Sequence, residues 1–284
     1  MTVTDVNVVK SAIFERPDDA NKGTLGSLLC VCGSYGMAGA AVMSAKGALR
    51  TGIGLAKCAL PRSIYPIVAQ TILESVYYPL SKNADGRISK VNVPFLVSES
   101  CKSSATLVGC GLGVCDDTLI KNSTTPLVLD ADALNCVAKQ PEILLRKKAP
   151  IIITPHPGEM SRLTGLATPL VNAERERVAL DFAQKYGVVT VLKGAGTVIA
   201  SPNGKVLVNP TGNSGMATGG SGDVLAGMTA SILAQGASAF SSAAAAVYLH
   251  GLAGDIAAEK YGKISMLPTD LINCIPLAYK RCGF

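Results

Sequence analysis

Short, largely apolar runs alternate with helical patterns along the chain from Leu25 onward. Runs that lack regularly placed polar residues are typical of strands buried on both faces of a sheet. We place them at Ser27–Cys32, Leu55–Ala59, Thr106–Gly109, Leu127–Leu129, Ile151–Thr154 and Val188–Leu192. The helical patterns lie at Gly39–Arg50, Asp116–Asn122, Val171–Tyr186, Val224–Gln235 and Ser241–Glu259. This alternation predicts an α/β fold with a doubly wound, mostly parallel sheet and helices on both faces.

Two regions in the C-terminal half depart from this alternation. Thr197–Ala200 and Val206–Val208 flank the turn Ser201-Pro-Asn-Gly204, which predicts a hairpin. The apolar region Val224–Ala258 consists of small residues with polar interruptions, which suits two closely packed buried helices better than a membrane span. With 284 residues and no linker, we expect residues 1–284 to form a single domain.

The stretch Asn209–Gly227 follows the hairpin and contains a glycine-dense loop that leads into the helix at Val224. Backbone N–H groups at such a junction attract phosphate oxygens, and glycine lets the ligand approach closely. Asp223 stands in the first turn, where a carboxylate repels phosphate but can accept a proton from an attacking hydroxyl. We favour Asp223 as a general base; the alternative is that it only complements the helix dipole.

Polar residues follow the predicted strands, where ligands bind in parallel sheets. Asp130 and Asp132 end one strand and could hold Mg²⁺ or meet a substrate hydroxyl, although Asp132 could equally cap the next helix. His156 lies between two prolines that keep it out of a helix, so we favour a ligand or catalytic role over a buried structural one. Glu159 is expected in the following helix turn, as a cap or within reach of a metal-bound phosphate.

Three further glycine-containing turns also follow strands. The glycines of Gly33–Gly39 alone are only weak evidence for a ligand-binding loop. The second turn, Gly109-Cys-Gly-Leu-Gly113, lacks the glycine spacing that binds dinucleotides, which excludes the dinucleotide-binding fold of hydride-transfer enzymes. The third turn is Lys193-Gly-Ala-Gly-Thr197. Its lysine can pair with a phosphate, and its glycines let the backbone approach that phosphate closely. The sequence does not match a P-loop. His250 is expected to be a packed helix residue.

The amino-acid composition limits the kinds of molecule that we expect this protein to bind. The net charge of +6 is spread along a chain with 5% aromatic residues and no Trp, which argues against nucleic acid and fits an anionic small molecule. The sequence contains nine scattered cysteines without a Cys-x-x-Cys pair, and two histidines. This pattern indicates neither a zinc site nor a set of disulfide bonds. Residues 1–16 lack the apolar core of a signal peptide, so we expect a cytoplasmic protein.

Three motifs together resemble the ADP-dependent NAD(P)H-hydrate dehydratases of the ribokinase-like superfamily. They are Thr154-Pro-His-Pro-Gly-Glu159, Lys193-Gly-Ala-Gly-Thr197 and the run from Asn209-Pro-Thr-Gly-Asn to Gly220-Ser-Gly-Asp223, and the resemblance extends from Lys22 to the C-terminus. It implies a ribokinase-like fold and the form of the enzyme that lacks an epimerase domain. Two positions depart from the family pattern: Cys110 replaces the usual proline, and Ser221 replaces the commoner threonine.

The resemblance also implies a reaction. Water added to NADH or NADPH leaves a hydroxyl at C6, and the S-epimer of this hydrate would be phosphorylated from ADP or ATP with Mg²⁺ and then lose phosphate to restore the cofactor. Asp223 would be catalytic, and the hydrate would contact Ala40, Gly111, His156 and Asp223. Glu159 would act near the metal, and the adenosine nucleotide would contact Lys193, Gly194, Ala195, Gly196, Thr197, Asn213, Gly220, Ser221 and Gly222.

Other functions stay open on the residues alone. A ribokinase-like kinase of a small vitamin-precursor alcohol shares Gly-x-Gly-Asp, whereas His156 in its Pro-His-Pro-Gly-Glu setting favours the dehydratase. A non-catalytic adenylate-binding protein would not need Asp223 and Lys193 together. The residues do not distinguish ADP from ATP, or the NADH from the NADPH hydrate. The small-residue helices near the C-terminus suggest a homo-oligomer, such as a tetramer.

Overall fold

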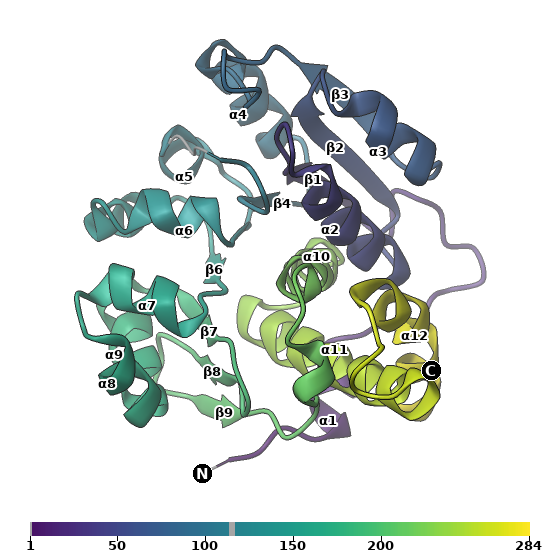
Figure 1. Ribbon diagram of the computed structural model, residues 1–284, viewed down its shortest axis with the longest axis vertical. Coiled ribbons are helices and arrows are strands. Elements are labelled where there is room, and N and C mark those ends of the chain that lie inside the picture. The colour runs from purple at the N-terminus through teal and green to yellow at the C-terminus, as the bar shows by residue number, and fades with distance from the viewer. Residues whose placement is uncertain (1, 114–116) are drawn as a thin grey trace.

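The computed structural model describes residues 2–113 and 117–284, and its centre is one nine-stranded sheet (Figure 1). The strand order is β3-β2-β1-β4-β5-β6-β7-β8-β9; the strands are parallel through β7, and β8 and β9 are antiparallel additions. The strands are β1 (Ser27–Val31), β2 (Leu55–Pro61), β3 (Val76–Leu80), β4 (Ala105–Val108), β5 (Leu127–Leu129), β6 (Ile151–Ile153), β7 (Val189–Leu192), β8 (Val198–Ala200) and β9 (Val206–Val208).

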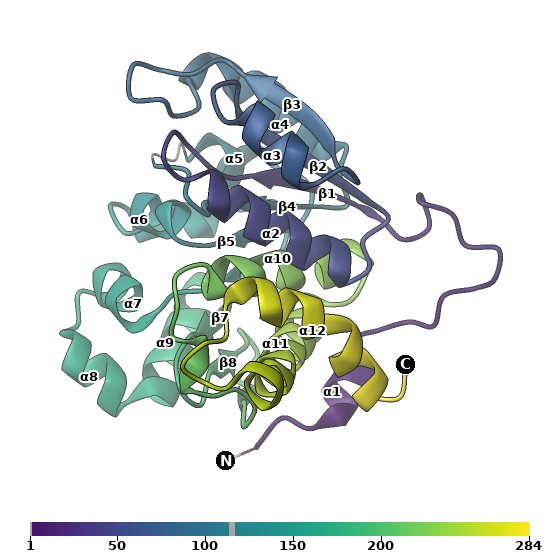
Figure 2. The same cartoon turned by 45° about the vertical axis from the view of Figure 1, so that its right-hand side comes forward.

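Helices cover both faces of this sheet, as Figures 1 and 2 show. The first face carries α1 (Val6–Lys10), α2 (Ala38–Arg50), α3 (Tyr65–Thr71), α10 (Ser221–Ala234), α11 (Ala239–Tyr261) and α12 (Pro268–Arg281). The second carries α4 (Val93–Cys101), α5 (Thr118–Asn122), α6 (Asp132–Val137), α7 (Pro157–Thr164), α8 (Thr168–Ala173) and α9 (Arg175–Tyr186). Short 3₁₀ turns lie at Lys90–Asn92, Pro141–Arg146 and Ser214–Met216.

The alternating side chains of the strands separate two hydrophobic cores. In β1, Leu28 and Cys30 point into the core under α2 and α10, whereas Leu29 and Val31 point into the core under α4 to α9. All four side chains are buried, which explains why the strand has no polar position. The doubly wound α/β prediction is therefore confirmed.

Several sequence predictions of individual elements were incomplete. The edge strand β3 was missed because it is half-exposed and contains Pro79, so it lacks the apolar signature of the central strands. The helix expected over Val171–Tyr186 is two helices, α8 and α9, which meet at Glu174. Helix α12 was also missed, and it contains Pro276 in its interior. Asp116, the predicted first residue of another helix, lies outside the described residues, and the helix that the structure shows there is α5, which begins at Thr118.

Helices α2 and α10 pack with their backbones almost in contact. A Cβ atom added at Gly227 of α10 would lie 2.0 Å from the carbonyl oxygen of Ser44, and one added at Gly47 of α2 would lie 2.8 Å from that of Val224. Only glycine permits this approach, which positions the first turn of α10 against the sheet. Most small residues of α10 and of the neighbouring helix α11 are buried, as the sequence predicted.

The described helices include none that is both long and apolar enough to cross a lipid bilayer.

The N-terminal segment extends the sheet beyond β9. Val3 forms a parallel bridge with Val208, with hydrogen bonds from the Thr4 amide to the Val208 carbonyl and from the Val208 amide to the Thr2 carbonyl. The Thr4 hydroxyl then donates to Oδ1 of Asn209, at 2.9 Å. The start of the glycine loop is therefore held by the first residues of the chain.

Candidate active site

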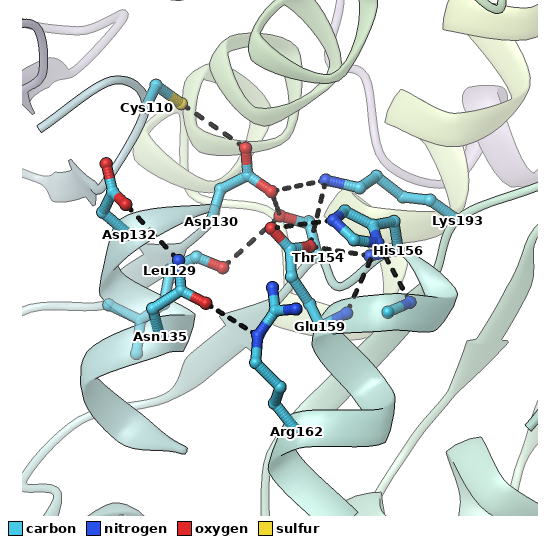
Figure 3. A network of polar contacts seen from close by, with 11 residues as sticks. Cys110, Leu129, Asp130, Asp132, Asn135, Thr154, His156, Glu159, Arg162 and Lys193 are labelled. Atoms are coloured by element: carbon cyan, nitrogen blue, oxygen red, sulfur yellow. Dashed lines mark hydrogen bonds and ion pairs between the residues drawn. The ribbon is translucent and has the colours of Figure 1, made fainter. Parts of the chain in front are cut away.

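Asp130 is the centre of a polar network at the carboxyl ends of β4 to β7 (Figure 3). Its buried carboxylate accepts hydrogen bonds at Oδ1 from the Thr154 hydroxyl, at 2.7 Å, and from Nζ of Lys193, at 2.6 Å. The Cys110 thiol donates to the other oxygen, Oδ2, at 3.6 Å. These residues follow neighbouring parallel strands, so the strand order brings them together.

Lys193 is less available to a phosphate than the sequence suggested. Besides Asp130, its Nζ lies 3.8 Å from Oε2 of Glu159, so two carboxylates share its charge. Burial opposes the charged amine, but these carboxylates outweigh burial and raise the pKa of Lys193. Lys193 is thus a permanently charged residue that holds Asp130 and Glu159, and its predicted contact with a nucleotide stays a prediction.

His156 and Glu159 form the N-terminus of α7. His156 has extended backbone and is the N-cap, where its Nδ1 accepts hydrogen bonds from the amides of Gly158 and Glu159, at 3.0 and 3.3 Å. The Glu159 carboxylate accepts from the His156 amide in return, at 2.8 Å. Because Nδ1 is an acceptor, the proton of the neutral ring is on Nε2. The imidazole is half-exposed, which agrees with the expected display from a rigid turn.

Asp223 stands in the first turn of α10, as predicted, beyond the left-handed Gly220. Its carboxylate, the Cys110 sulfur and the Asp130 carboxylate have ligand atoms within 4.8 Å of one another. Burial first, and then the charge of Asp130, raise the pKa of Asp223 from 3.8 to about 6, although the Cys110 thiol and Lys193 lower it. A carboxylate with this pKa is a stronger base than ordinary Asp and is still mostly ionised at neutral pH.

The glycine loop before α10 is anchored by a residue that the sequence analysis overlooked. Asp255 of α11 accepts a hydrogen bond from the Gly212 amide, at 2.9 Å, and one from Nδ2 of Asn213, at 2.9 Å. The Asn213 amide also donates to the Gly254 carbonyl and accepts from the Gly215 amide. The side chain of Asn213 therefore holds the loop, and its predicted nucleotide contact stays untested. An acid inside a long helix gave no signal in the sequence.

Gly194 and Gly196 shape the loop between β7 and β8, and both have positive φ angles, of 147° and 64°. Thr197 closes this turn by donating its hydroxyl to the Gly194 carbonyl, at 2.9 Å. A Cβ atom at Gly222 of α10 would lie 3.5 Å from Nζ of Lys193. The two predicted nucleotide motifs, Lys193–Thr197 and Gly220–Gly222, are thus adjacent in the folded chain. Ala195 lies in the first of them and is exposed.

The predicted hydrate-binding residues Ala40 and Gly111 are also neighbours. A Cβ atom added at Gly111 would be 2.7 Å from that of Ala40 and 3.0 Å from that of Met37. Gly111 has a φ of 60°, so glycine is required there both by the backbone and by the space. This contact places the start of α2 beside the turn after β4, one residue from Cys110.

Two further predictions can be compared with the structure. Asp132 does not cap α6, since Ala131 is the N-cap; instead its carboxylate accepts from the Gly113 amide, at 2.7 Å, and from Asn135. His250 is a packed helix residue, as expected. It is buried, and its Nε2 lies 3.0 Å from the Ser221 carbonyl oxygen. Burial first lowers the pKa of His250 to about 4, so this ring is neutral and supports the start of α10.

The charges at this edge of the sheet suit a phosphoryl group accompanied by Mg²⁺. Three carboxylates, those of Asp130, Glu159 and Asp223, gather around one lysine and would repel an unaccompanied polyphosphate. Mg²⁺ takes carboxylate oxygens and keeps much of its water. Among the described residues, the polar contact of Glu159 Oε1 is the one at 3.5 Å with His156, so this oxygen can accept a hydrogen bond from such a water. The residues present therefore fit the ion.

A model of the NAD(P)H-hydrate dehydratase family matches residues 28–277. The chain belongs to this family. The match covers the sheet from the second residue of β1 to the end of β9, and it includes every site residue described above.

Two relatives illustrate the range of the NAD(P)H-hydrate dehydratase family. The bifunctional NAD(P)H-hydrate repair enzyme Nnr of Moorella thermoacetica is 38% identical over 96% of this chain, which spans about half (52%) of that protein. The ADP-dependent (S)-NAD(P)H-hydrate dehydratase of Bacillus subtilis is 31% identical over 96% of both chains.

Solved structures of similar proteins share the fold. The ADP/ATP-dependent NAD(P)H-hydrate dehydratase of Bacillus subtilis, co-crystallised with ATP and Mg²⁺, has a TM-score of 0.84 with 29% identity over 99% of both chains. A ribokinase-like superfamily protein of Enterococcus faecalis has a TM-score of 0.84 with 26% identity, over 99% of this chain and 96% of its own. The expected ribokinase-like fold is confirmed.

Proposed function

We propose that this protein dehydrates the S-epimer of NADH hydrate and NADPH hydrate, using ADP or ATP as phosphoryl donor, to restore the reduced cofactor. The observation that carries this function is the position of Asp223, a carboxylate with raised pKa at the end of a glycine loop. The family to which the chain belongs, and the ATP and Mg²⁺ in the related Bacillus subtilis crystal, support the same reaction.

The reaction would proceed in two stages. Asp223 accepts the proton of the C6 hydroxyl as its oxygen attacks the terminal phosphorus of the nucleotide, which leaves AMP from ADP or ADP from ATP. The C6 phosphate then departs as the ring nitrogen donates its electron pair, and loss of a proton from C5 completes the double bond. Bound Mg²⁺ would neutralise the developing charge on the transferring phosphoryl group.

The protein's own groups support distinct parts of these stages. The N-terminus of α10, at Gly220, Ser221 and Gly222, would offer backbone N–H groups to the transferring phosphoryl oxygens, although the Ser221 amide already donates to the Thr218 carbonyl, at 3.2 Å. Lys193 holds Asp130 and Glu159 in fixed orientations beside them. The half-exposed His156, whose Nε2 carries the proton and lies 3.5 Å from Oε1 of Glu159, would donate a hydrogen bond to the hydrate from beside this carboxylate. Glu159 would hold Mg²⁺ through water.

The test combines the purified protein with Mg²⁺ and an NADH-hydrate preparation, and adds ADP or ATP separately. Recovery of reduced-nicotinamide absorbance, in step with AMP or ADP production, would establish the reaction and the donor. The same assay with Asp223→Asn should show loss of activity by orders of magnitude. A vitamin-precursor kinase would instead show no recovery of the cofactor and would convert a small alcohol to a stable phosphate ester. Nucleotide binding without either reaction would indicate an adenylate-binding protein.

We also infer that residues 1–284 fold as one domain, which the single continuous sheet supports, and that the protein works in the cytoplasm with its cofactor substrates. We predicted a homo-oligomer from the small-residue helices near the C-terminus. Most small residues of α10 and α11 are buried within the protomer, so these helices do not support that prediction. Light scattering of the purified protein would give its oligomeric state directly.

A further inference from the structure

Cys110, Asp130 and Asp223 bring three metal-binding atoms together at the active site. The ligand atoms of the thiol and the two carboxylates lie within 4.8 Å of one another; Cys110 and Asp130 are buried, and Asp223 is partly buried. They come from the end of β4, the end of β5 and the first turn of α10. No spacing rule connects residues so far apart in the sequence, so only the fold shows this set.

The Asp130 carboxylate is oriented so that one oxygen belongs to this set. Oδ1 is occupied by the Thr154 hydroxyl and by Nζ of Lys193, whereas Oδ2 faces the Cys110 sulfur, as Figure 3 shows. Because two strong donors fix Oδ1, Oδ2 cannot turn away from the thiol without breaking them. A cation at the three atoms would therefore find Asp130 already in position.

The separation of the atoms fits a small tetrahedral ion. Zinc bonds of about 2.3 Å to sulfur and about 2.0–2.2 Å to oxygen place those two ligands about 3.6 Å apart in a tetrahedron. The distance between the Cys110 sulfur and Oδ2 of Asp130 is 3.6 Å. Because all three ligand atoms lie within 4.8 Å of one another, Asp223 would have to approach by no more than about 1.4 Å, which a change in side-chain torsion at a partly buried residue allows. A thiolate excludes Mg²⁺, which takes oxygen ligands, and selects a softer divalent ion.

We propose that Cys110, Asp130 and Asp223 form an inhibitory site for Zn²⁺ and similar thiophilic divalent cations, with water as the fourth ligand. Binding replaces the thiol proton with the metal, so Cys–SH and Zn²⁺ give a zinc thiolate and one proton released to solvent. The ion binds the carboxylate oxygen with which Asp223 would accept the substrate proton, so it would inhibit the reaction. The binding site rests on the geometry alone, whereas the inhibition rests on the proposed function.

The neighbouring charges favour the ion. While the thiol is protonated, three negative charges, on Asp130, Glu159 and Asp223, surround the single positive charge of Lys193. Replacing the thiol proton with a divalent cation changes the net charge of this group from −2 to −1. The partial burial of the cluster strengthens this attraction, because water screens it less than at the surface.

The binding test titrates the protein with Co²⁺, a spectroscopic substitute for Zn²⁺, in the absence of Mg²⁺. We expect one Co²⁺ per chain with a thiolate-to-cobalt charge-transfer band in the near ultraviolet. Cys110→Ser, which preserves the side-chain volume, should lose the band and bind at least tenfold more weakly. Cys101→Ala, which removes an exposed thiol elsewhere, should behave as the wild type. Asp223→Asn should keep the band but weaken binding at least tenfold.

Two results would overturn the site: no charge-transfer band in the wild type, or a band of full intensity in Cys110→Ser. If Cys110→Ser does not fold, as judged by circular dichroism, unchanged Co²⁺ affinity in Asp223→Asn overturns it instead. In the dehydratase assay, the Zn²⁺ concentration that halves activity should rise at least tenfold in Cys110→Ser, relative to its own zinc-free rate. A wild type without dehydratase activity would refute the proposed function and leave the cobalt result to decide the site.

Discussion

Asp223→Asn should make the protein more stable while removing its activity. The folded environment raises the pKa of this carboxyl from 3.8 to about 6, so folding disfavours its charge. Each pKa unit is worth about 1.4 kcal/mol, so the ionised side chain costs the fold about 3 kcal/mol. Between the unfolded and the folded pKa the folded state binds more protons, so stability falls as pH rises through this window, and the cost is complete above about pH 6.

Urea unfolding followed by circular dichroism measures this cost. At about pH 8, Asp223→Asn should gain up to about 3 kcal/mol over the wild type, and the gain should shrink toward zero near pH 4. Asp85→Asn is the matched control, since Asp85 is exposed on the loop after β3, and it should change stability little at either pH. A variant that is less stable than the wild type at pH 8, or whose gain persists near pH 4, would refute this account of the site.

Three further predictions concern the site and its support. Since Asp223 must be ionised to act as base, kcat/KM should fall about tenfold per pH unit below about pH 6, as measured by a pH–rate profile. Gly227→Ala should cost about 3 kcal/mol or more in urea unfolding, because its Cβ would lie 2.0 Å from the Ser44 carbonyl, whereas Gly39→Ala, with no atom within 4 Å, should gain about 1 kcal/mol. Asp255→Ala releases two hydrogen bonds of the glycine loop and should raise the KM for nucleotide about tenfold, with little change in the KM for hydrate.

The central strands were readable from the sequence because burial on both faces leaves them without polar positions. β5 and β9 have the predicted bounds, and the other predicted strands differ by two residues or fewer at each end. The same reasoning could not find β3, whose outer position in the sheet leaves it half-exposed. Helix α12 has an apolar face, but its internal proline obscured the pattern.

The site was predictable to the extent that strand ends collect polar residues. This rule located Asp130, His156 and Lys193, and the helix start located Asp223. It could not show that Lys193 would form ion pairs with Asp130, because that contact depends on the order of the strands in the sheet. The thiol of Cys110 appeared in the sequence only as a departure from the family pattern, and its contact with Asp130 required the folded chain.

The anchoring of the glycine loop couples its position to that of α11. Thr211, Gly212 and Asn213 are bonded to α11, and a Cβ atom at Gly251 of that helix would lie 2.2 Å from the Thr211 hydroxyl, so loop and helix form one tightly packed body. Any displacement of the glycine loop would therefore have to carry the middle of α11 with it.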